Sequence, residues 1–167
     1  MISEVSIKKC ENYEFYKVKE AIKRSLKEIK AFDLFKKNKK VLLKPNLVAP
    51  RTNEQAINTH PFVVKAMIQI IKEKGAIPIV GDMSGFIRNC CTDYVSEYIG
   101  LKKILDKEKV EFTNFRKNGF RKVDILDAKY LKKAYIAKEV LDADIVIWRK
   151  KIFIIFNFVS NINRFNY

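Results

Sequence analysis

The spacing of apolar residues along the chain predicts helices that alternate with short buried strands. Apolar side chains recur on one helical face across residues 13–30 and again across residues 61–74, and Gly75 ends the second pattern. The continuous apolar runs at 41–43 and 77–80 are typical of strands that are covered on both faces in a parallel sheet. This alternation predicts an α/β architecture.

Shorter patterns extend the alternation towards the C-terminus. We expect a mainly parallel sheet with helices on both faces, which is incomplete at its C-terminal end. The further strands are predicted at 5–7, 110–112, 123–126 and 143–147, the further helices at 92–98 and 101–109, and the pattern is mixed at 134–141.

The last residues do not fit this picture. From Ile152 to Tyr167, twelve of the sixteen residues are Ile, Phe or Asn, and these are residues that codons of A and T alone specify. We therefore predict a partial α/β domain over residues 1–148 and an atypical tail over 149–167, produced by a frameshift or early stop. The alternative is a genuine terminal strand. On the first interpretation, the sheet edge at 145–147 and the apolar run at 152–159 are left uncovered and favour self-association.

Length and charge narrow the class of protein. The chain has 167 residues, which suits one domain, and its formal net charge of +15 favours contact with polyanions. The basic residues are scattered, however, and the densest clusters, at 36–40 and 149–151, contain no aromatic residues on which bases could stack. The composition favours a solvated, lysine-rich surface, with nucleic-acid or polyanion binding as the alternative.

The cysteines exclude several kinds of site within this chain. Cys10, Cys90 and Cys91 are odd in number, include a vicinal pair and form no C-x-x-C motif, which argues against a disulfide scaffold, a zinc site or an iron–sulfur cluster. No apolar signal region opens the sequence, and the longest apolar stretch is too short to span a bilayer. We expect a cytoplasmic protein without a membrane segment.

Polar residues follow both predicted strands, at the edge where open parallel sheets bind ligands. Lys44 offers a cation for a carboxylate or phosphate, and Asn46 follows it. Asp82 suits a metal ion or a substrate hydroxyl, and Ser84 adds a hydrogen bond. We predict that Lys44 and Asp82 converge with His60 on one cleft.

The start of the second helix contributes the other candidates. His60, the single histidine, suits proton transfer or metal ligation, and Thr59 lies beside it, where free N–H groups of a helix start favour an anion. Both residues also suit helix capping, the simpler interpretation. No G-x-G-x-x-G or P-loop motif is present.

Four segments together resemble the family known as domain of unknown function 362. They are VLLKPNLVAP at 41–50, NTHPFVVKAMIQIIKEKGA at 58–76, IPIVGDMSG at 77–85 and IAKEVLDADIVI at 136–147. The K-P-N and T-H-P motifs map Lys44, Asn46, Thr59 and His60 onto the family pattern, and the G-D motif maps Asp82. The motif around Asp82 lacks the family's proline.

The resemblance implies a bacterial or archaeal protein of undefined activity, many of whose relatives carry four-iron–four-sulfur motifs farther along the chain. The family's second histidine and downstream segments are absent here, so we expect a truncated member that retains a residual anion- or metal-binding pocket. The cofactor and the question of catalysis stay open. The alternatives are a polyanion-binding protein and a subunit completed by a separate chain.

Overall fold

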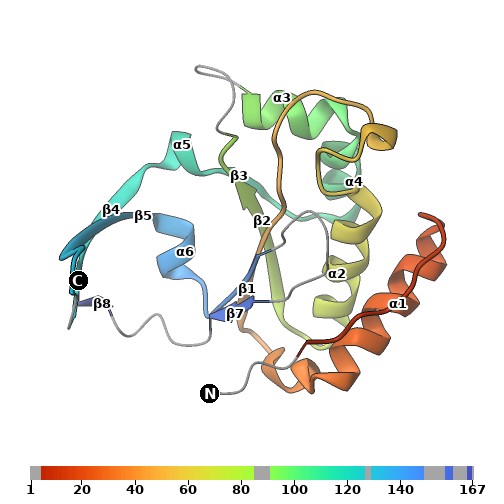
Figure 1. Cartoon of the computed structure of the whole chain (residues 1–167), viewed down its shortest axis with the longest axis horizontal. Coiled ribbons are helices and arrows are strands. Elements are labelled where there is room, and N and C mark those ends of the chain that lie inside the picture. Colours follow the sequence, from red (N-terminus) through yellow and green to blue (C-terminus); the bar gives the residue numbers. More distant parts are fainter. Residues whose placement is uncertain (1–4, 85–90, 127–128, 149–156, 160–164, 167) are drawn as a thin grey trace.

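The computed structural model describes residues 5–84, 91–126, 129–148, 157–159 and 165–166. Helices lie on two sides of a central sheet, and a curved hairpin extends from one side (Figure 1). In chain order the elements are α1 (Phe15–Glu28), η1 (Ala31–Leu34), β1 (Lys40–Lys44), η2 (Asn53–Gln55), α2 (Pro61–Glu73), β2 (Ile77–Asp82), α3 (Cys91–Tyr98), α4 (Leu101–Glu108), β3 (Phe112–Asn114), α5 (Phe115–Asn118), β4 (Phe120–Ile125), β5 (Lys133–Ala137), α6 (Lys138–Asp142), β6 (Ile145–Trp148), β7 (Asn157–Val159) and β8 (Phe165–Asn166).

The central sheet is mainly parallel. Its strand order is β3-β2-β1-β6-β7, and β1 pairs in parallel with both β2 and β6, so that Leu42 lies opposite Ile79 and Val146. Strand β3 continues the parallel sheet beside β2, whereas β7 runs antiparallel to β6. The α/β class and the mainly parallel sheet predicted from the sequence are confirmed.

Alternate residues of each strand enter two separate cores, because successive side chains of a strand point to opposite faces. Val41 and Leu43 lie in a large core that α1, α2, α3 and α4 complete. Leu42, between them, lies in a small core with four other buried residues, among them Phe115 and Val146. Helices α5 and α6 cover this second face (Figure 1).

Helix α1 packs mainly on α2 through one apolar face, whereas α2 lies between α1, α4 and the sheet and is buried on most of its surface. Val18, Ile22 and Leu26 of α1 are buried, and their spacing of four residues places them on one side of the helix. Helix α2 has Pro61 at its first position, where the missing N–H costs nothing, and Gly75 follows its end with a φ of +75°.

Residues 5–7 do not form the predicted strand. The side chains of Val5 and Ile7 are exposed, so this apolar run covers nothing and lacks the burial that stabilises a strand. The segment is instead held to the end of α1, since the Ser6 hydroxyl donates to the carboxylate of Glu28 and Lys8 forms an ion pair with it at 2.7 Å.

A second sheet, which the apolar pattern does not predict as such, takes two of its strands from the chain between β3 and β6. Strands β4 and β5 form an antiparallel hairpin, and β8 pairs with the other edge of β4. The mixed pattern at 134–141 resolves into β5 followed directly by α6. Two different periods in so short a segment explain why neither dominates the sequence.

The predicted uncovered edge at residues 145–147 is wrong. Ile145, Val146 and Ile147 are all buried, and β6 pairs with β7 with Val146 opposite Val159. Most of the tail, at 149–156, 160–164 and 167, lies outside the described residues, so its origin by frameshift stays a prediction. Within the described part of the chain, no helix has the length and apolar composition needed to cross a lipid bilayer.

Candidate functional site

The candidate residues share one edge of the central sheet. Lys44 ends β1 and Asp82 ends β2, and because the two strands are parallel, their carboxyl ends lie at the same edge. His60 caps α2, the helix that connects these strands, so it also lies at this edge. The topology confirms the common edge predicted from the sequence.

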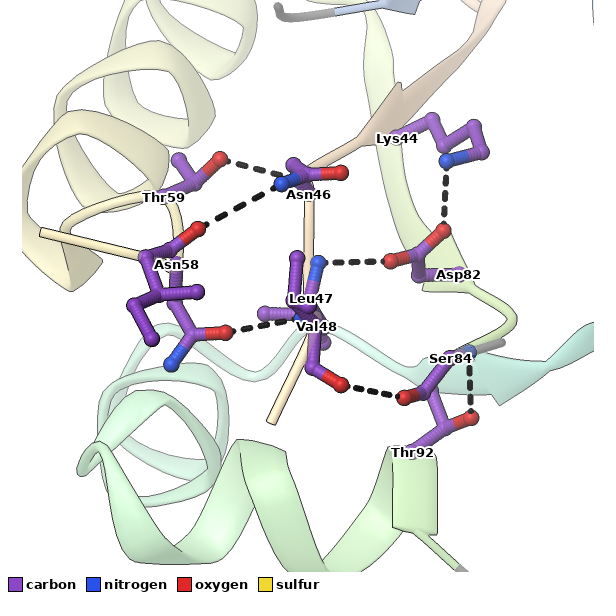
Figure 2. Close-up of polar contacts among 10 residues, drawn as sticks. Lys44, Asn46, Leu47, Val48, Asn58, Thr59, Asp82, Ser84 and Thr92 are labelled. Carbon is purple, nitrogen blue, oxygen red and sulfur yellow. Dashed lines mark hydrogen bonds and ion pairs between the residues drawn. The ribbon is translucent and has the colours of Figure 1, made fainter. Parts of the chain in front are cut away.

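Lys44 and Asp82 form an ion pair at the centre of this edge. The Lys44 Nζ and Asp82 Oδ1 atoms are 2.6 Å apart, and the Asp82 side chain is 2% exposed whereas that of Lys44 is 26% exposed. The second carboxylate oxygen, Oδ2, accepts a 2.8 Å hydrogen bond from the backbone N–H of Leu47 (Figure 2). Buried charge is costly without partners, and here both oxygens have one.

The loop that follows β1 is tied to its neighbours on both sides (Figure 2). On one side the Thr59 hydroxyl accepts from the Asn46 N–H at 2.9 Å, and the Asn58 carboxamide oxygen accepts from the Val48 N–H at 2.8 Å. On the other side the Ser84 hydroxyl donates to the Val48 carbonyl at 2.8 Å. Asn46, Thr59 and Ser84, which the sequence nominates as ligand-binding residues, therefore hold the loop in place.

His60 performs the capping role that was the simpler interpretation of the sequence. Its Nδ1 accepts from the Phe62 N–H at 3.2 Å, and its carbonyl accepts from the Val63 N–H at 3.0 Å. Pro61 has no N–H to offer. The donors of the first turn are thus occupied, so this helix start does not supply the anion-binding N–H groups that we predicted.

The His60 ring lies towards the N-terminal segment. It stacks on Tyr13 with the ring centroids 3.9 Å apart and an interplanar angle of 9°. A small polar cavity of about 30 Å³ lies beside the pair and is also lined by Asn46, Asn53 and Thr59. Of the three side chains predicted to converge on one cleft, those of Lys44 and Asp82 form an ion pair, whereas the His60 ring stacks on Tyr13.

Gly81 allows the neighbouring strand to approach Asp82 closely. A Cβ atom at this position would lie 2.3 Å from Thr113 Cγ2 and 2.5 Å from Phe115 Cε1. Gly81 lies inside β2, so its role is close packing.

Sequence reasoning missed Trp148. This residue ends β6, and the parallel register places it opposite Lys44. The Lys44 ammonium lies 5.7 Å from the centroid of its ring, and the tryptophan is 47% exposed. The apolar run at 143–147 marks a third parallel strand, so the residue that ends it could have been nominated together with Lys44 and Asp82.

Metal ligation finds little support in the described residues. No group of three or more His, Cys, Asp or Glu side chains able to hold a metal ion occurs among them, and both oxygens of Asp82 contact Lys44 or Leu47. A four-iron–four-sulfur cluster takes four thiolates, whereas the sequence has three cysteines. The residues present in this chain do not fit such a cluster.

Comparison with known proteins agrees with the sequence resemblance. The family described as domain of unknown function (DUF362) matches residues 41–152, more than half of the chain. The chain belongs to the DUF362 family. The matched segment contains Lys44, His60, Asp82 and Trp148, and therefore the whole candidate site.

One similar protein is the thylakoid-associated protein sll1697 of Synechocystis sp. It is 30% identical to this DUF362 chain over 148 residues, which are 88% of the chain and 44% of the relative. The chain thus spans less than half the length of that relative. No solved structure matches the chain.

Proposed function

We propose that this DUF362 domain binds a small anion, a carboxylate or a phosphate, at Lys44 beside Trp148. The observation that carries the proposal is a lysine that reaches the surface while its counter-charge, Asp82, is buried. An ammonium group has three donors, and an acidic partner occupying one of them holds it in position without using the others. A ligand at the edge of the sheet meets a pre-positioned cation.

Trp148 adds an apolar surface to this cation. Trp148 is 47% exposed and its ring lies beside the Lys44 ammonium, so a ligand that places an anionic group on Lys44 can rest its apolar part on the indole. Sites that combine a few polar groups with an aromatic wall are typical of small-molecule binding.

We assign no reaction to this chain. Proton transfer by His60 stays a prediction. Because Nδ1 accepts from the Phe62 N–H, Nε2 carries the proton of the neutral ring, and uptake of a second proton at Nδ1 would break the cap of α2. Metal or hydroxyl binding by Asp82 likewise stays a prediction. A redox role, which the resemblance implies for longer relatives, would need cluster ligands beyond the three cysteines of this sequence.

Trp148 is the single tryptophan of the chain, so its fluorescence reports directly on the site. Titration with inorganic phosphate and with small carboxylates should change the emission and saturate. The variant Lys44→Met should weaken binding about tenfold or more, the usual loss when a charged hydrogen bond to a ligand is removed.

Lys40→Met is the matched control, since Lys40 begins the same strand at the opposite edge of the sheet and its side chain is exposed. It should leave the titration unchanged. Equal weakening by both variants would show that general positive charge attracts the anion, and absence of a saturable change in the parent protein would refute the proposed function.

Polyanion binding is the second candidate, favoured by the net charge of +15. It predicts retention on heparin and binding to a random duplex that survives moderate salt, whereas generic attraction is lost steeply with salt. The third candidate, a subunit completed by a separate chain, predicts a stable partner that co-purifies with this protein.

A further inference from the structure

Several exposed apolar side chains lie on the β4–β5 hairpin. It lies at the far side of the central sheet from α1 (Figure 1). Near its tip, Leu126 is exposed, Tyr130 is 85% exposed and Leu131 is 63% exposed. Phe120 and Tyr135, on the strands, are exposed as well. Exposed apolar residues gathered in this way mark an interaction surface.

Lysines alternate with these apolar residues. Lys129 and Lys132 flank Tyr130 and Leu131 in the chain, and the Lys129 ammonium lies 5.3 Å from the Tyr130 ring centroid. On the strands the antiparallel register sets Lys122 directly opposite Tyr135, which places both side chains on the same face. The described residues 120–126 and 129–137 thus form a surface that is both basic and apolar.

The lysines decide what kind of partner can cover this surface. A second copy of the hairpin would bring its own excess of lysines, and like charges that face one another repel. A polyanion matches the charge and a base can stack on Tyr130, but such a partner leaves the exposed Leu126 and Leu131 without an apolar contact. A lipid bilayer accommodates the leucine, tyrosine and lysine side chains together. Leucine enters the acyl boundary, tyrosine favours the interface and lysine binds the phosphate of the headgroup.

We propose that residues 126 and 129–132, between β4 and β5, bind the surface of an anionic lipid bilayer. Leu126, Tyr130 and Leu131 enter the headgroup region, and the neighbouring lysines contact lipid phosphates. The contact is peripheral and does not involve Lys44 or Trp148, so this inference is independent of the proposed anion site.

Co-sedimentation of the full chain with vesicles tests the proposal. We expect binding to vesicles of phosphatidylcholine mixed with phosphatidylglycerol and little binding to phosphatidylcholine alone. The double variant Leu126→Ser/Leu131→Ser should lose most of the binding that persists at raised salt. The double variant Lys129→Gln/Lys132→Gln should reduce binding at low salt by more than tenfold, since each lysine near an anionic surface contributes about fivefold.

Two control variants match these changes elsewhere on the surface. Lys36→Gln/Lys37→Gln removes the same charge from the exposed cluster at 36–40, and Tyr16→Ser removes an exposed ring from α1. Both should keep most of the binding. The far-ultraviolet circular dichroism and the melting temperature of every variant should equal those of the parent, because all the substituted side chains are exposed.

Three results would overturn the proposal. Control variants that lose as much binding as the hairpin variants would show that net charge alone attracts the vesicles. Tight binding to a single-stranded oligonucleotide that the hairpin variants abolish, without vesicle binding, would identify a nucleic-acid partner. A dimer in solution that the leucine variant dissociates would identify a second copy as the occupant.

Discussion

The two faces of the central sheet are covered by layers of very different thickness. Leu43 lies in the large core that four helices complete, whereas Leu42, its neighbour along β1, lies in the small core under α5 and α6. Both leucines are buried. Burial of a single residue therefore does not reveal how thick the layer above it is. Lys44 follows Leu42 by two residues and so leaves the strand on the thinly covered face.

The largest expected effect comes from truncating these two leucines. Leu43→Ala should lower the free energy of unfolding by about 3–4 kcal/mol and Leu42→Ala by about 2–3 kcal/mol, since a thin layer collapses more readily into the cavity. Urea unfolding of both variants measures the difference. Equal losses would show that the small core is as rigid as the large one.

A methyl group at Gly81 probes the packing of the small core. Gly81→Ala should lower the free energy of unfolding by about 2–3 kcal/mol, because its Cβ would overlap Thr113 and Phe115. Thr113→Ser removes Cγ2, the atom that would lie 2.3 Å from the new Cβ, but keeps the hydroxyl. The double variant should therefore recover part of the loss, and simple additivity of the two changes would contradict this account.

Substitutions at His60 distinguish the contribution of helix capping to stability from that of ring stacking. His60→Ala should cost about 1–2 kcal/mol, since it removes both the cap of α2 and the contact with Tyr13. Asparagine is a good capping residue, so His60→Asn should restore about half of the loss. Thermal unfolding compares the two variants, and Tyr13→Ala should match the part that asparagine does not restore.

Asp144, which directly precedes β6, makes a smaller, pH-dependent contribution to stability beside the start of β1. The Lys39 ammonium at 2.8 Å and the Lys40 N–H hold the pKa of the Asp144 carboxyl below its ordinary value of 3.8. Because the folded-state pKa is lowered, the ionised carboxylate stabilises the protein at neutral pH. This contribution is lost as the pH falls through the lowered value.

Asp144→Asn should therefore cost less than about 1 kcal/mol at neutral pH, since the pair is exposed. The difference from the parent should shrink below pH 3.8. Urea unfolding of the variant and the parent, at neutral pH and below pH 3.8, measures this difference in the free energy of unfolding. A constant difference would show that the carboxylate stabilises the fold by something other than its charge.

Removal of residues 152–167 should have the smallest effect on stability. If the tail is foreign to the domain, as its composition predicts, the melting temperature should not fall and the yield of dissolved protein should rise. A lower melting temperature would show that the pairing of β7 with β6 stabilises the fold. Sequencing the downstream DNA tests the frameshift independently.

The sequence predicts the central sheet well because its apolar runs are continuous. Each of the buried strands β1, β2 and β6 coincides with an uninterrupted apolar run, and α2 coincides with a capped helical period. The β4–β5 hairpin is harder to predict, because its strands mix charged and apolar residues and bury only Val123 and Ala137. The sequence does not show which hairpin residues share a face, whereas the strand register places Lys122 opposite Tyr135.

The candidate site also has a part that the sequence predicts and a part that it does not. The location of Lys44 and Asp82 at one edge follows from the parallel strand order, which the sequence supports. The internal partners of Asn46, Thr59 and Ser84 depend on the path of a loop that no periodicity describes. The position of Trp148 beside Lys44 depends on β6 pairing with β1 rather than with β2.

The central position of β1 also determines the order in which a growing polypeptide can assemble. Val41 pairs with Pro78 on one side and with Ile145 on the other, so its first neighbour is synthesised early and its second neighbour late. While the ribosome adds the intervening residues, one edge of β1 has no strand beside it and can pair with other nascent chains. Molecular chaperones that shield extended segments should therefore matter most for this protein before β6 emerges.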